Sequence, residues 1–249
     1  MKTDSGNGRG RMYLELFRGI AVKHDQANMV ISKIRNCGLQ GDEGFWRFVG
    51  WRLREHINKL FYKQGLTTKD TREGYSEFPV IAFADELGAH YYALRHNYRP
   101  GRVPLVIRAR LNIQAKYIYI DGRDFLYPVF GLWDKGRLAK TRGIKGAYHV
   151  VSDVLRKAYG DKILKYFKKA SQTQDSSYRI AMCDLAVHDL DIVLAHVSNK
   201  MVIKGRYNVT FRASFFVEAP IKPEEIVEVY EPDPYKFSFT PDIDLYTWL

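Results

Sequence analysis

Two residues near the start of the chain, Arg18 and Gly19, have types and spacing that suit binding of a phosphorylated ligand with a flat ring. A guanidinium fixed at a strand end presents several planar N–H donors to phosphate or ribose oxygens. Glycine lets a flat ring approach the backbone, where N–H and C=O groups from Gly19 to Ile20 can pair with an amide. The alternative is a surface arginine in a salt bridge, followed by a glycine in a turn.

A second segment, 78–85, is apolar and ends in Asp85, a residue typical of helix N-caps. It predicts a strand that leads into a helix. The aromatic side chains of Phe83, Tyr91 and Tyr92 can stack on a flat ring or on a nucleobase. The alternative is that all three belong to the core.

A third segment, 207–217, alternates as a strand does and leads through a proline-containing turn into a last strand at 226–230. Alternation places Ala213 on the same face as Phe211, Phe215 and Val217. An alanine among such bulky residues resembles a truncated side chain. The alternative is an ordinary small core residue.

In this order the three segments resemble the mono-ADP-ribosyltransferases, whose core opens on an Arg–Gly strand, a helix and a loop over NAD⁺. The resemblance implies an α+β fold with a mixed, mostly antiparallel split sheet, and an enzyme of the glycosyltransferase class that uses NAD⁺ as substrate without a metal. The residues implied to contact NAD⁺ are Arg18, Gly19, Ile20, Phe83, Ala84 and Tyr92. Many members carry Ser or Thr where Ala82 and Ala84 stand here, so hydroxyls that usually support the site are missing.

The resemblance also implies a catalytic glutamate on the late strand, acting together with Arg18. Its carboxylate would bind the 2′-hydroxyl of the nicotinamide ribose and stabilise the positive charge of the transition state. Counting back from Pro223, its slot falls at Ala213 or Ser214, and neither residue has a carboxylate. The chain is then an inactivated variant, a natural pseudoenzyme, or an enzyme that uses Glu218 in a shifted register.

Positive charge is concentrated between residues 135 and 169, where eleven Lys and Arg residues are opposed by two Asp. Such a surface attracts phosphates and releases counterions on binding. We expect it to bind RNA or single-stranded DNA through Lys145, Arg156, Lys157, Lys162, Lys165 and Lys169. Aromatic residues interleave with these cations, namely Tyr148, Tyr159, Tyr166 and Phe167. The alternatives are a solubilising face and a surface for an acidic partner protein.

Several other functions lack their motifs. The chain has no Walker-type phosphate loop, no Cys- or His-based metal motif and no nucleophile elbow. Asp184, His188, Asp189 and Asp191 are close in sequence, but their spacing matches no metal site and indicates a solvated turn. The two distant cysteines, the absence of a secretory signal and the lack of a long apolar run favour a cytoplasmic protein.

The periodicity of apolar residues predicts an α+β class, because strands and helices mostly do not alternate. Residues 1–12 are expected to form a flexible start, and 13–249 a single ADP-ribosyltransferase-like domain. Strands are predicted over 13–20, 79–84, 103–111, 117–120, 191–197, 207–217 and 226–230. Helices are predicted over 29–34 with Asp25 as cap and Gly38 as end, over 45–64 and 85–94, and over 150–169 with a break at Gly160.

The leading hypothesis is a toxin-like transferase that places ADP-ribose on a nucleobase, similar to members of toxin–antitoxin and phage-defence systems. Its partners would be a nucleic acid and a restraining antitoxin protein, without a membrane. One alternative is transfer to a protein side chain. Another is a non-catalytic nucleic-acid-binding module, and NAD⁺ binding separates it from both transferases.

Overall fold

The computed structural model describes residues 2–3, 12–41, 79–130, 143–237 and 240–248. These residues fall into two compact units. The first contains the described residues up to 41, those from 79 to 118 and those from 209 to 240; the second contains the others. The prediction of a single domain over 13–249 stays a prediction, and the helix predicted over 45–64 lies outside the described residues.

An antiparallel sheet forms the first unit. Its strands follow the order β8-β3-β2-β4-β9, in which neighbours along the chain are mostly not neighbours in the sheet. The bounds are β2 (Met12–Lys23), β3 (Val80–Ala84), β4 (Arg102–Asn112), β8 (Ser214–Glu218) and β9 (Ile226–Tyr230). The short strand β1 (Lys2–Thr3), within the start predicted to be flexible, pairs with β2. The predicted α+β class is confirmed.

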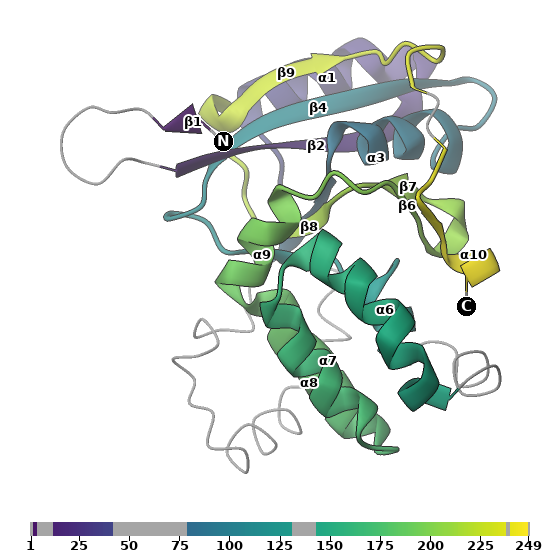
Figure 1. The fold of residues 1–249 in the computed structure, drawn as a ribbon. Helices are drawn as coiled ribbons and strands as arrows, with labels where there is room; N and C mark the ends of the chain where they lie inside the picture. Colours follow the sequence, from purple (N-terminus) through teal and green to yellow (C-terminus); the bar gives the residue numbers. More distant parts are fainter. Residues whose placement is uncertain (1, 4–11, 42–78, 131–142, 238–239, 249) are drawn as a thin grey trace. The chain divides into compact units, whose positions relative to one another are not determined.

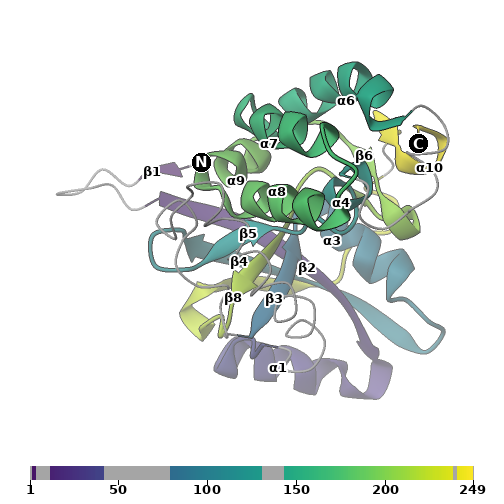
Figure 2. The same ribbon diagram turned by 90° about the horizontal axis from the view of Figure 1, so that it is seen from below.

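Helices cover the two faces of this sheet (Figures 1 and 2). On one face, Ile34 of α1 (Ala27–Cys37) packs against Ile107 and Val229. On the other, Ala89 of α3 (Glu86–Tyr91) and Ala93 of the π-helical turn η2 (Tyr92–His96) pack against Val106. These two apolar layers fix which strand residues point to which helix.

The ends of the two helices test the predicted caps. Asp85 caps α3, since its carboxylate accepts from the backbone N–H groups of Leu87 and Gly88, as predicted. Gly38 ends α1 with a φ of 69°, also as predicted. The Asp25 cap is wrong: a 3-10 turn, η1 (His24–Gln26), precedes α1, so Asp25 lies inside that turn and Gln26 takes the cap position.

Gly19 has a packing reason to be glycine. A Cβ at this position would lie 1.8 Å from the carbonyl oxygen of Ala89 and 2.7 Å from the backbone nitrogen of Ala93. Both atoms belong to the backbone of the helical segment and cannot rotate away. The missing side chain therefore lets α3 and η2 approach β2 closely.

We expect Gly19→Ala to lower the free energy of unfolding by about 2–3 kcal/mol, because the added methyl group forces the helix from the sheet. Urea unfolding followed by circular dichroism measures this. Gly101→Ala is the control: a Cβ there meets nothing within 4 Å and the φ of 80° adds only backbone strain, about 1 kcal/mol. Equal losses in the two variants would contradict the packing role of Gly19.

A buried histidine lies on the same helical face. His90 is 2% exposed, its Nε2 lies 3.1 Å from the hydroxyl of Tyr230, and its ring centroid lies 3.9 Å from that of Phe237. Burial, assisted by the positive charge of Lys236 and opposed by Asp233 and Asp85, lowers the pKa of His90 from 6.5 to about 4. The fold therefore holds His90 neutral.

This shift predicts acid sensitivity. Below pH 6.5 the unfolded chain gains a proton on His90 that the folded chain does not take up until about pH 4. The stabilisation is present above pH 6.5 and is lost as the pH falls towards 4, with a slope of up to about 1.4 kcal/mol per pH unit. Urea unfolding between pH 7.5 and 4 is expected to show a shallower loss in His90→Gln than in the parent chain. Parallel curves would remove His90 as the cause.

Helices dominate the second unit, and no helix in the described part of the chain is long and apolar enough to cross a membrane. The longer ones are α6 (Gly143–Tyr159), α7 (Lys162–Ser171), α8 (Ser176–His188) and α9 (Leu190–Val197). The shorter elements are α4 (Leu126–Val129), η3 (Arg206–Asn208), α10 (Leu245–Trp248) and the parallel pair β6 (Ile203–Lys204) and β10 (Ile243–Asp244). The predicted break at Gly160, with a φ of 82°, separates α6 from α7.

Two predicted strands are corrected. The strand at 191–197 is wrong, because α9 occupies it: Asp189 accepts from the backbone N–H of Asp191 and starts a helix in an apolar run that has no alternation. The strand at 207–217 is interrupted, because Tyr207 and Asn208 adopt left-handed φ values of 59° and 60°. It becomes η3, β7 (Thr210–Phe211) and β8, while the strand at 117–120 corresponds to β5 (Ile118–Ile120).

Candidate functional site

The sheet of the first unit separates between β2 and β3. Within the described parts of these strands, Phe17 and Ala84 are the one registered pair, whereas β2 pairs with β4 along its whole length. Beyond that pair, side chains bond to backbone carbonyls: Nη1 of Arg18 donates to Ala82 at 2.7 Å, and Nδ2 of Asn97 donates to Gly19 at 3.1 Å. We call this region, from Phe17 to Gly19 and from Ala82 to Ala84, the β2–β3 seam.

The three sequence segments meet at the seam. Phe17 pairs with Ala84, and Ala84 pairs with Ser214 of β8, so one row crosses three adjacent strands. Two strand spacings, about 10 Å, therefore separate the row position of β2 from that of β8. Ala213 comes directly before β8, and its carbonyl accepts from the N–H of Asp85 at 2.7 Å. The predicted lateral proximity of Arg18 and the 213–214 segment thus agrees with the register.

The faces of the sheet distinguish the candidate glutamate slots. Arg18 pairs with Ile107 and shares the α1 face, while Phe17 and Ser214 share the α3 face. Ala213 precedes Ser214, so alternation returns it to the face of Arg18. Of the two slots, 213 lies on the side of Arg18 and 214 on the opposite side.

Glu218 lies at the other end of β8, opposite Val80. Alternation puts it on the face of Ser214, away from Arg18. Its carboxylate accepts from the backbone N–H of Tyr117 at 3.1 Å, and its own N–H donates to the carbonyl of Tyr117. The structure thus gives Glu218 a bonding role at the strand end and does not bring it to the Arg18 face.

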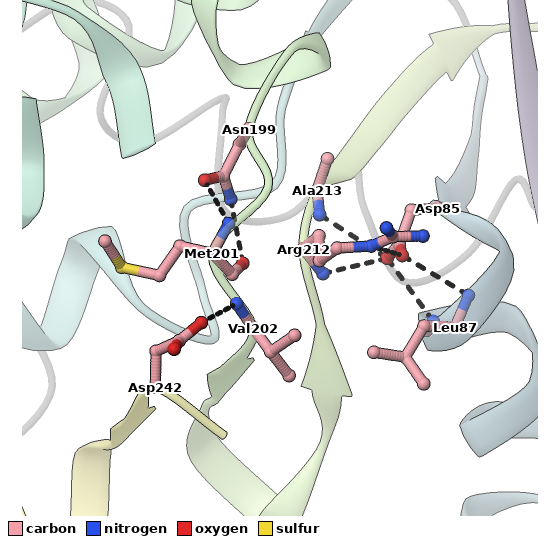
Figure 3. Close-up of polar contacts among 9 residues, drawn as sticks. Asp85, Leu87, Asn199, Met201, Val202, Arg212, Ala213 and Asp242 are labelled. Carbon is pink, nitrogen blue, oxygen red and sulfur yellow. Dashed lines mark hydrogen bonds and ion pairs between the residues drawn. The ribbon is translucent and has the colours of Figure 1, made fainter. Parts of the chain in front are cut away.

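Asp85 holds the 212–213 segment against the start of α3 (Figure 3). Besides capping the helix, Oδ1 accepts from the backbone N–H of Arg212 at 2.9 Å and from that of Ala213 at 3.4 Å. Oδ2 forms a 3.0 Å ion pair with Nε of Arg212. One carboxylate therefore fixes the helix start and the residue expected to carry the catalytic group.

The other residues predicted to contact the cofactor take different places. Tyr92 lies in η2, which packs on the α3 face, so the structure does not bring it to Arg18. Phe83 is 3% exposed and is paired with Phe215, as a core residue would be. Ile20 packs beneath α1. Gly19 and Ala84 remain at the seam.

The basic window divides into paired and exposed cations. Lys162 forms ion pairs with Asp189 at 2.7 Å and Asp191 at 2.9 Å, and Arg156 pairs with Asp153 and Asp161. Lys157, Lys165 and Lys169 are exposed, and the side chain of Lys145 lies outside the described ones.

The interleaved aromatics are mostly structural. Tyr159 stacks on His196 with 4.6 Å between ring centroids, and Phe167 meets Phe130 edge to face; both Tyr159 and Phe167 are buried. The hydroxyl of Tyr166 donates to Asp189 at 2.9 Å. These side chains serve the packing of α6 and α7, so base stacking by Tyr159 and Phe167 is not supported.

The predicted solvated turn around residue 184 is wrong. Asp184, His188 and Asp189 are buried, because α8 continues to His188 and places the first two one turn apart, with Nε2 of His188 3.6 Å from Oδ1 of Asp184. Tyr119 stacks on His188 at 4.4 Å. Among the described residues, no group of three or more His, Cys, Asp or Glu side chains has the geometry to hold a metal ion.

Two functional positions were missed in the sequence. Arg212 and Asn97 bond to the seam or to its support, yet neither belongs to a motif. No local signal identifies them, because each acts across a long separation in sequence. Asp85 was recognised only as a helix cap.

No family model matches the sequence of this chain, no curated protein matches it, and no solved structure matches its fold. Function is therefore inferred from the chemistry of the seam. That chemistry consists of a guanidinium, a separated strand pair and a small residue at 213 held by a carboxylate.

Asp85→Asn is expected to destabilise the chain by about 1–3 kcal/mol, because the amide loses the ion pair with Arg212 and part of the helix cap. Thermal unfolding followed by circular dichroism measures the loss. Asp25→Asn, an exposed position in η1, is the matched control and is expected to change little. If the two variants unfold alike, Asp85 does not hold the 212–213 segment.

Proposed function

We propose that the chain is an NAD⁺-dependent mono-ADP-ribosyltransferase of toxin-like type, directed at a nucleic acid, RNA or single-stranded DNA. Position 213 is the place of its catalytic carboxylate, and with alanine there the chain binds NAD⁺ but barely turns it over. The observation that carries the proposal is the row from Phe17 through Ala84 to Ser214, which unites the three segments that resemble the family.

The seam supports the binding of NAD⁺ through its open backbone and its cation. A separated strand pair offers backbone N–H and C=O groups to a ligand amide, as sheet edges do to peptides. Arg18 is anchored to Ala82, which orients its guanidinium towards the seam. A planar cation held in this way suits the diphosphate or ribose of the dinucleotide.

The reaction breaks the bond between nicotinamide and C1′ of its ribose and forms a bond from C1′ to a nucleophile of the target. Nicotinamide leaves with the bonding electron pair, and positive charge develops on the ribose. A carboxylate at 213, on the Arg18 face, would bind the 2′-hydroxyl and stabilise that charge. Alanine offers neither charge nor hydrogen bond, so binding continues while chemistry stops.

A nucleic-acid target is supported by the net charge of +11 and by the exposed Lys157, Lys165 and Lys169 on α6 and α7. Exposed cations of this kind neutralise backbone phosphates. A toxin of this type in the cytoplasm would need an antitoxin protein as partner. Transfer to a protein side chain is the second candidate within the same reaction class.

The test restores the carboxylate. Ala213→Glu is expected to raise nicotinamide release from NAD⁺ by about 10²–10³-fold over the chain as given, the usual effect of one preorganised electrostatic group. Ala213 is 4% exposed, so the new carboxylate also costs stability without ligand. We expect a lower melting temperature for Ala213→Glu and a larger upward shift on adding NAD⁺. Chromatography of nicotinamide and thermal shift measure the two effects.

Ser214→Glu is the matched control, because its carboxylate falls on the α3 face; it is expected to release no more nicotinamide than the parent. Glu218→Ala is expected to leave the parent unchanged. If the parent already turns over and Glu218→Ala abolishes turnover, Glu218 is the catalytic residue. If no variant binds or cleaves NAD⁺, the proposal fails in favour of a nucleic-acid-binding module.

A further inference from the structure

A second cluster of cations lies in the first unit, at the end where β2 and β4 run side by side (Figure 2). Lys23 pairs with Arg102 there, and the N–H of His24 donates to the carbonyl of Gly101 at 3.1 Å. The preceding turn brings Arg95 and Arg99 from η2 and its exit. We call Lys23, His24, Arg95, Tyr98, Arg99 and Arg102 the basic tip.

The basic tip carries charge without matching acids. None of its four Lys and Arg side chains forms a salt bridge with another described residue, and Asp25 is the one acidic residue in the segments 21–26 and 92–102. All four are exposed. Exposed cations that lack partners release counterions when they bind phosphate.

The turn is held in shape by two of its arginines. Nη1 of Arg99 donates to the carbonyls of His96 at 3.2 Å and Tyr98 at 2.6 Å, and Nη1 of Arg102 donates to that of Ala21 at 3.2 Å. Tyr98 stays 42% exposed in the middle of the turn. A fixed aromatic ring among cations is the arrangement that binds single strands, because the ring stacks on a base while the cations follow the backbone.

We propose that the basic tip binds single-stranded nucleic acid, with Tyr98 as the stacking platform and Lys23 and Arg95 as phosphate contacts. This rests on the proposed function, since it identifies the surface that would present the target to the seam. Along β2 the tip lies five residues from Arg18, about 17 Å, a distance that roughly five stacked nucleotides span. The tip and the seam belong to the same unit, so their separation is set by one strand pair.

The experiment measures binding of the full chain to a fluorescein-labelled single-stranded oligouridine by anisotropy at several salt concentrations. Lys23→Glu with Arg95→Glu is compared with Lys33→Glu with Lys222→Glu, two exposed cations of the first unit outside the tip. Both pairs change the net charge equally. The tip pair is expected to bind at least about tenfold more weakly than the control pair, with a shallower dependence on salt by about 0.7 per lost contact.

Tyr98→Ala is expected to weaken binding by about fivefold or more, while Tyr98→Phe keeps the parental affinity because the ring still stacks. If the tip pair binds oligouridine as tightly as the control pair, or binds an acidic peptide just as well, the proposal is overturned. Melting temperatures of all variants exclude loss of folding as the cause. The thermal shift by NAD⁺ is recorded on the same samples: oligouridine binding through the tip without an NAD⁺ shift refutes the transferase alone, and the reverse refutes the tip alone.

Discussion

The separation of β2 from β3 is the constraint on which the candidate site depends. A sheet interior normally satisfies its backbone groups in the ladder, and an unpaired buried carbonyl is costly. At the seam Arg18 and Asn97 replace the missing strand pairs, and α3 can lie close to β2 only because Gly19 has no side chain. The same features that preserve stability leave a cation beside an open stretch of backbone.

Much of this arrangement follows from local sequence. Alternation predicted β2, β3, β4 and β9, and the Asp85 cap and the Gly38 end followed from residue type, because strands and caps depend on neighbouring residues. The strand order did not follow, nor did the contacts of Arg212 and Asn97, since these arise between segments far apart in the chain. The error at 191–197 has a similar origin: a short apolar run suits a buried helix as well as a strand, and the cap at Asp189 decides between them.

For the candidate site, the sequence predicted the order of the segments and the importance of position 213, while the structure assigned the faces. Tyr92 and Phe83 were selected for their aromatic rings, yet one belongs to a helix on the opposite face and the other to the core. Ring chemistry says little about orientation. Charge showed the same limit in α6 and α7, where Lys162 and Arg156 form ion pairs with acids that no local pattern connects to them.

The contacts of Asp85 with Arg212 join residues 127 positions apart in the chain. A ribosome must therefore synthesise most of the polypeptide before this carboxylate finds its partners, and the strand order delays closure of the sheet in the same way. Residue 213 cannot be held in place on an unfinished chain. If the protein acts as a toxin, its own topology postpones the assembly of the site until synthesis is nearly complete, which gives a cognate inhibitor time to engage the nascent chain.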